Sequence, residues 1–106
     1  MSVAQEELLA QVKAAILAIE PGAEVILYGS RARGEAEPDA DWDLLILLDG
    51  SVDADRITRT RRRVYEVEWE TDEVLSTIVE SREVWNGPLS LPTPFYRNVE
   101  REGVRL

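Results

Sequence analysis

The chain has 106 residues, a formal net charge of −9, and neither cysteine nor histidine. A chain of this length can bury one core, and its composition is that of an ordinary globular protein. The lack of cysteine and histidine excludes disulfides, thiolate metal sites and imidazole bases, so any metal ligand or base must be an oxygen donor. The net negative charge argues against a protein that binds nucleic acid through an overall positive electrostatic potential.

The sequence does not predict a membrane protein. No apolar run reaches spanning length, and residues 1–20 carry glutamates and a helical period rather than the pattern of a signal peptide. The lack of cysteine fits a cytoplasmic location. We therefore expect a single cytoplasmic domain over residues 1–106, with no linker, internal repeat or low-complexity segment.

Apolar residues recur at helical spacing over residues 3–19, which predicts an amphipathic helix that covers one face of a sheet. Ser2 is the expected N-cap, and Pro21-Gly22 is expected to end the helix. The apolar stripe consists of Leu8, Leu9, Val12, Ala15, Ile16 and Ile19. Its expected role is structural.

A short apolar run, Val25 to Tyr28, predicts a buried strand that leads directly into Gly29-Ser30. Glycine allows a close backbone approach, and a turn into a short helix would point N–H groups outward, where phosphate oxygens can bind. The Ser30 hydroxyl can donate to the same phosphate. Taken alone, Gly-Ser is more often a plain turn.

Arg31 and Arg33 follow on the next turn. An arginine in such a loop is usually a solvated surface charge, but beside a phosphate site contact with the ligand becomes about equally frequent. The sequence does not separate the two side chains. Residues 35–40 are then expected to form a loop, with Pro38-Asp39 as its turn.

Asp41 and Asp43 flank Trp42 at the start of a second apolar run, which continues to Leu48 and predicts another buried strand. Alternate residues of a strand face the same side, so both carboxylates lie within reach of one ion. Two carboxylates this close repel each other unless a cation lies between them, and hard oxygen ligands suit Mg²⁺. A phosphate cradle that faces a carboxylate pair is the equipment of phosphoryl or nucleotidyl transfer. The plain alternative is an exposed strand entrance that carries acids.

Gly29-Ser30, ten residues, and then Asp41-Trp42-Asp43 resemble the GS…DxD signature of the nucleotidyltransferase superfamily that includes DNA polymerase β. The string GSRARG and the chain length resemble the minimal nucleotidyltransferases of prokaryotes. Residues 93–103 also resemble the ending of one branch of that family. The resemblance therefore spans most of the chain and is most specific over residues 29–43.

The resemblance implies Mg²⁺-dependent transfer of a nucleoside monophosphate, most simply AMP from ATP, to a hydroxyl. Asp41 and Asp43 would be the catalytic, metal-binding pair. The implied nucleotide-binding residues are Gly29, Ser30, Arg31 and Arg33. Members of this family often pair with a HEPN-domain protein, as the antitoxin of a toxin–antitoxin module, and can adenylylate that partner. Family and small size also favour an oligomer, either a homo-oligomer or a hetero-complex.

Residues 53–71 predict a long helix, with Asp53 or Ser51 near its N-cap. Its first half concentrates arginines, and three glutamates follow in its second half. Such a pattern is most often a solvated helix with acid–base pairs. The sharper alternative is a basic patch for a nucleotide tail or an acidic partner.

Residues 74–79 predict a third strand. In the superfamily this strand commonly carries a third carboxylate that can act as general base, and Ser76 takes that position here. The base is therefore unassigned, and a second hypothesis follows: a non-catalytic binding module that neutralises a partner by contact. A third hypothesis, transfer to a hydroxylated antibiotic, rests on resemblance to aminoglycoside nucleotidyltransferases, whose second domain this chain lacks.

Ser81 is expected to cap a turn that ends near Trp85, and a final short helix is expected over about 94–101, ending at Gly103. The apolar side chains of this region either cover a core, which is the commoner case, or form a partner surface. They are Trp85, Leu89, Leu91, Phe95 and Tyr96. Together the elements predict an α/β (α+β) nucleotidyltransferase fold, with a small mixed β-sheet and helices packed mainly on one face.

Overall fold

Four strands form one mixed sheet in the order β3-β2-β1-β4, in a computed structural model that describes residues 1–106. The strands are β1 (Glu24–Tyr28), β2 (Trp42–Leu48), β3 (Leu75–Ser81) and β4 (Val104–Arg105). β1 runs antiparallel to both of its neighbours, whereas β2 and β3 are parallel. The parallel pair needs a crossover connection, and helix α3 (Ala54–Thr71) supplies it.

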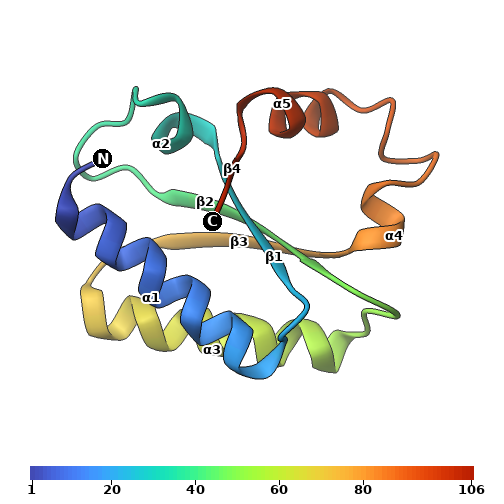
Figure 1. Cartoon of the computed structure of the whole chain (residues 1–106), viewed down its shortest axis with the longest axis horizontal. Coiled ribbons are helices and arrows are strands. Elements are labelled where there is room, and N and C mark those ends of the chain that lie inside the picture. The colour runs from blue at the N-terminus through green and yellow to red at the C-terminus, as the bar shows by residue number, and fades with distance from the viewer.

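The helices cover the two faces of this sheet unequally (Figure 1). The long helices α1 (Val3–Ile19) and α3 pack against each other on one face. The short helices α4 (Arg82–Trp85) and α5 (Pro94–Glu102) lie on the other side of the sheet. The short helix α2 (Gly29–Arg33) lies at the end of β1, and its Ala32 packs against the core that α1 and α3 cover. The expected mixed sheet with its helices mainly on one face is confirmed. None of these helices combines the length and the apolar character that crossing a membrane requires.

Each face of the sheet has its own apolar core. The larger core joins α1 and α3 to the sheet, and Trp42 and Leu44 of β2 both point into it. The alternation of β2 therefore leaves Asp43 on the opposite face. The smaller core on that opposite face consists of Ile26, Leu45, Leu47, Trp85 and Val99. The core prediction for the C-terminal aromatic region is thus confirmed for Trp85, whereas Leu89 is 86% exposed.

Local side-chain caps define where the helices begin. Ser2 forms a capping box with Gln5 at the start of α1, as the sequence predicts. Asp53, rather than Ser51, accepts a hydrogen bond from the Arg56 N–H at the start of α3. The expected Ser81 cap is also present, because its hydroxyl accepts from the Val84 N–H.

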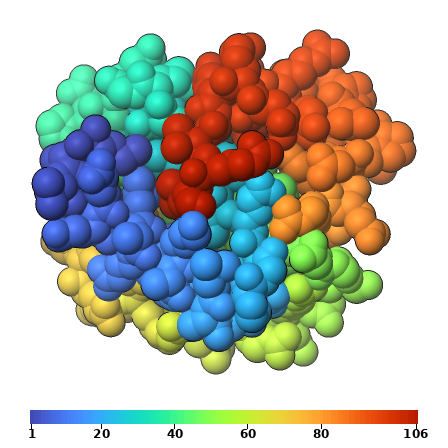
Figure 2. All heavy atoms as spheres, viewed as in Figure 1, coloured from blue at the N-terminus to red at the C-terminus, as the bar shows by residue number.

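Two features of the C-terminal half go beyond the sequence prediction. β3 continues to Ser81, two residues past its expected end, and the two-residue strand β4 follows α5. β4 pairs with β1 through Ile26 and Leu27, and the Leu106 N–H donates to the Val25 carbonyl. Figure 2 shows the C-terminal residues lying on the surface beside the N-terminal helix and β1.

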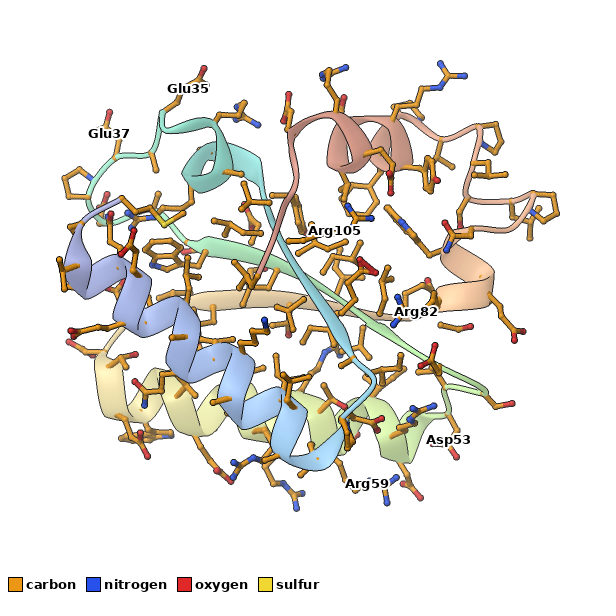
Figure 3. The ribbon with its side chains drawn as sticks, viewed as in Figure 1. Glu35, Glu37, Asp53, Arg59, Arg82 and Arg105 are labelled. Carbon is orange, nitrogen blue, oxygen red and sulfur yellow. The ribbon has the colours of Figure 1, made fainter.

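A network of ion pairs holds the end of the sheet where β1 begins and β2 ends. Glu24 pairs with both Arg82 and Arg105, and Arg82 also contacts Asp49 at 2.8 Å. Figure 3 shows how Arg82 and Arg105 point from separate segments toward this region. Arg56 of α3 makes a two-pronged contact with Glu20 at 2.7 and 2.8 Å. These contacts join segments that are distant in the sequence.

Candidate active site

The turn after β1 places Gly29 against the carboxylate of Asp43. Tyr28 pairs with Asp43 across the two antiparallel strands, so the next residue lies beside the same side chain. Gly29 has φ +75°, and a Cβ built on it would overlap the Asp43 Oδ2 atom and lie 3.2 Å from its Cγ. Only glycine combines this backbone conformation with room for the carboxylate. The packing of Asp43 therefore requires the first residue of the GS motif.

Asp41 and Asp43 form an acidic pair without a compensating partner. Neither carboxylate makes a salt bridge, whereas nine such contacts occur elsewhere in the chain. Partial burial raises the pKa of Asp43, the negative charge of Asp41 raises it further, and the positive charge of Arg33 lowers it. The pair is therefore a place where a cation would relieve an unfavourable charge.

The donor chemistry of this pair fits Mg²⁺, which prefers carboxylate oxygens and keeps several ligands from water or substrate phosphates. No group of three or more aspartates or glutamates in the chain is arranged to hold a metal ion. Asp41 and Asp43 alone would supply the protein ligands. The remaining ligands would have to come from phosphate oxygens and water.

Ser76 lies directly beside Asp43, because the two residues are paired in the parallel register of β2 and β3. Paired residues of neighbouring strands point to the same face, and Ser76 is exposed there. The nearby acids do not replace it: Glu73 accepts a hydrogen bond from the indole of the core residue Trp42, and Glu80 lies level with Leu47 farther along the strand. The site therefore contains two carboxylates and a hydroxyl where a third carboxylate was the family expectation.

Arg31 is committed to the loop that precedes Asp41. Its guanidinium donates to the carbonyl of Ala40 at 2.8 Å and to that of Pro38 at 3.1 Å. It also lies 4.2 Å from the centre of the Trp42 ring. Arg31 thus fixes the approach of the chain to the acidic pair, a role that the sequence did not predict for it.

Arg33 is the cation whose charge acts on Asp43. Its guanidinium forms salt bridges of 3.1 Å with Glu35 and with Glu102 of α5, and it remains 39% exposed. In Figure 3, Glu35 and Glu37 point outward from the loop rather than toward the sheet. The structure therefore separates the two arginines that the sequence left equivalent. Contact of either one with a nucleotide stays a prediction.

Tyr28 is a neighbour of the acidic pair that the sequence analysis assigned only to the strand. Burial raises the pKa of its phenol, and the charge of Asp43 raises it further. The Tyr28 ring packs edge-on against Phe95 of α5 at a centroid distance of 5.3 Å. The sequence signal that could have identified Tyr28 as a site residue was its position at the C-terminal end of β1, directly before Gly29.

Comparison with known proteins agrees with this geometry. Residues 9–102 match the family described as "Nucleotidyltransferase domain". The chain is also 36% identical over 83 residues to the "Putative protein adenylyltransferase" of Methanocaldococcus jannaschii, across 76% of this chain and 73% of that relative. The family match includes both halves of the GS…DxD signature.

Proposed function

The chain belongs to the nucleotidyltransferase domain family, and from this premise we propose that it transfers AMP from ATP, with Mg²⁺, to a hydroxyl of a partner protein. The observation that carries the proposal is the unpaired Asp41–Asp43 pair beside a glycine whose missing Cβ makes room for the Asp43 carboxylate. An acid pair that lacks a cation in the protein is suited to one that arrives with the triphosphate.

Each residue of the site has a role in this proposal. Asp41 and Asp43 hold the metal, which when bound neutralises phosphate charge and stabilises the charge that develops at the α-phosphate. Gly29 and Ser30 bind the triphosphate through a backbone N–H and a hydroxyl. Arg33 adds positive charge at the same place. Arg31 holds the loop that leads to Asp41, so we assign it a positioning role.

The transfer itself is a displacement at the α-phosphorus. The acceptor oxygen forms a bond to phosphorus, the bond to the bridging oxygen breaks, and pyrophosphate leaves. Ser76 lies beside Asp43 and offers no carboxylate to take the hydroxyl proton. We therefore assign that proton to water or to a group that the acceptor protein itself brings.

The acceptor is proposed to be a protein because the curated relative is named as a protein adenylyltransferase. The resemblance to minimal nucleotidyltransferases further favours a HEPN-domain protein, with this chain as the antitoxin of the pair. The net charge of −9 does not favour a nucleic acid acceptor. Within the cell, ATP would be the nucleotide and Mg²⁺ the metal.

The test is transfer of label from α-³²P-ATP, with Mg²⁺, to the protein encoded by the neighbouring gene. Label on that protein should disappear with Asp41→Ala/Asp43→Ala and persist with Asp49→Ala, an acid at the other end of β2 whose partner is Arg82. Absence of label with every nucleoside triphosphate, while the two proteins still bind each other, would reject transfer.

That last outcome would support a second candidate function, a binding module that neutralises its partner by contact. The observation that favours it is Ser76 in place of a third carboxylate beside Asp43. Contact should then survive Asp41→Ala/Asp43→Ala. Ser76→Asp tests the same choice by adding a carboxylate instead of removing one. If Asp41 and Asp43 form a metal site, this variant should bind Mg²⁺ about tenfold more tightly than the wild-type chain.

A further inference from the structure

Helix α3 presents two large aromatic side chains to solvent. Tyr65 is 57% exposed and Trp69 is 76% exposed, and their rings meet edge-on at 6.3 Å. Val64 and Val67 of the same helix are buried in the core, so the aromatic pair lies on the outer side. Exposed tryptophan next to tyrosine is typical of a surface that another molecule covers.

The aromatic pair lines a hollow whose chemistry suits a guanidinium group. Tyr65 and Trp69 share this hollow of about 200 Å³ with two acidic residues, Glu68 and Asp72. Aromatic faces attract a cation, and carboxylates accept its N–H groups. The volume is below that of typical small-molecule pockets, so a single side chain is the better fit.

Arginines that could fill such a hollow lie earlier on the same helix. Arg59, Arg61 and Arg62 are exposed and make no salt bridge, although the chain has an excess of acids. Arg56 and Arg63, in contrast, are paired with Glu20 and Glu66. Arg62 lies seven residues, about two turns, before Trp69. Each copy of the helix therefore carries both a free guanidinium and, at a separate position, a hollow that could bind one.

The positive and negative charges of α3 are separated along its length. Five arginines lie between residues 56 and 63, and four acids lie between residues 66 and 72. The acids of the last turn are unfavourable at the negative end of the helix dipole, whereas Asp53 at the N-cap and Asp55 in the first turn are favourable at its positive end. An antiparallel neighbour with the same charge order would place acids beside the arginines at both ends.

We propose that two copies of the chain associate through α3, with the helices antiparallel about a two-fold axis close to Tyr65. Such an axis brings Arg62 of each copy to Trp69 of the other, and Arg59 of each copy to Asp72 of the other. Each hollow then receives an arginine. α3 packs on the face of the sheet opposite Asp43, so this dimer leaves the acidic pair open. The proposal is independent of nucleotidyl transfer.

The test is sedimentation equilibrium of the full chain over a range of concentrations. The wild-type chain should form dimers that dissociate on going from about 50 to 500 mM NaCl, because the pairing is largely electrostatic. Arg62→Glu and Trp69→Ala should each raise the dimer Kd by about tenfold or more. The matched control is Arg97→Glu, a charge reversal at another exposed arginine without a salt bridge, which should leave the dimer Kd unchanged.

Acrylamide quenching of tryptophan fluorescence gives a second measurement. Trp42 and Trp85 are buried, so the accessible emission comes from Trp69. Quenching should decrease as concentration rises in the wild-type chain and stay constant in Arg62→Glu. A wild-type chain that stays monomeric at low salt would overturn the proposal. A dimer that persists in both Arg62→Glu and Trp69→Ala would also overturn it. So would quenching of Trp69 that an added arginine-containing peptide reduces but a higher concentration of the chain does not.

Discussion

The two ends of β2 carry acids that the protein treats in opposite ways. At its end, Asp49 pairs with Arg82, and the nearby Glu20 and Glu24 also have arginine partners. At its start, Asp41 and Asp43 have none, and the pKa of Asp43 is raised by burial and by Asp41. The same residue type thus stabilises the sheet at one end and opposes folding at the other.

Under the proposed function, this difference separates acids that stabilise the fold from acids that bind a ligand. A buried or half-buried carboxylate normally has a partner, since an unpaired charge away from water is unfavourable. The protein has arginines available for the purpose, yet Arg31 beside the pair binds backbone carbonyls instead. An unpaired acid whose pKa is raised by burial and by a neighbouring carboxylate is the pattern on which we base the proposed site.

The largest effect should follow from removing one unpaired acid. Asp43→Asn should lower the transfer rate by about a hundredfold or more, because the proposed metal site would lose one of its two carboxylates. The same change should leave thermal stability unchanged or slightly higher, since an unfavourable charge disappears. Transfer assays and thermal unfolding of one preparation measure both. Asp49→Asn is the control and should show the reverse, with normal transfer and lower stability.

Breaking a paired acid should instead destabilise the fold without touching the chemistry. Arg56→Ala removes four hydrogen bonds, two to Glu20 and two to the carbonyls of Asp49 and Ser51. We expect the free energy of unfolding to fall by about 2–3 kcal/mol, as measured by urea titration. Arg97→Ala should change it by less than about 0.5 kcal/mol. If the Arg56→Ala variant were folded but inactive in transfer, the two ends of β2 would not have separate roles in stability and in chemistry.

Two glycines offer a matched test of the close approach at the unpaired end. Gly29 and Gly34 have nearly equal φ angles, +75° and +73°, but a Cβ at Gly34 would meet nothing within 4 Å. Gly34→Ala should therefore cost only the backbone term, about 1 kcal/mol. Gly29→Ala should cost about 2–3 kcal/mol and also reduce transfer, because Asp43 must move. Equal losses in urea unfolding would show that Asp43 does not constrain Gly29.

The smallest effect should appear in the pH dependence of stability. Hydrogen bonds from Arg56 lower the pKa of Glu20 below 4.5, so its contribution is full above that pH and is lost as pH falls through the lowered pKa. Burial raises the pKa of Asp43 above 3.8, so its unfavourable contribution grows as pH rises through the raised pKa.

Urea unfolding between about pH 3 and 7 compares these two acids directly. With rising pH, Asp43→Asn should gain stability relative to the wild-type chain, whereas Glu20→Gln should lose it. The two differences therefore have opposite signs. Parallel curves for the two variants would mean that both carboxylates are in the same electrostatic situation.

Local signals in the sequence predicted most of the fold. Short apolar runs located the strand that leads into Gly29 and the strand that carries Asp43. Capping side chains located the helix starts at Ser2 and Ser81 and, with Ser51 as the alternative, at Asp53. These features depend on residues a few positions apart, where backbone geometry alone determines what can meet. The family resemblance, rather than a local pattern, assigned Ser76 to the position of a third carboxylate, and the parallel register of β2 and β3 pairs it with Asp43.

Contacts between distant segments were not predictable in this way. β4 consists of two exposed residues, and only its pairing with β1 makes it a strand. Glu24 meets Arg82 and Arg105 because the sheet order brings three separate segments together. The roles of Arg31 and Arg33 likewise depend on the direction in which each side chain extends from the short helix α2. Such partners follow from topology, which local patterns do not contain.

The overlap between a Cβ at Gly29 and the carboxylate of Asp43 also restricts the order in which such a chain can change over generations. A descendant that no longer needed the carboxylate could first shorten Asp43, and only then would position 29 tolerate a larger residue. The reverse order passes through a clashing intermediate. Among related sequences, a residue other than glycine at position 29 should therefore occur with a small or uncharged residue at position 43. Related sequences that retain Asp43 should also retain glycine at position 29.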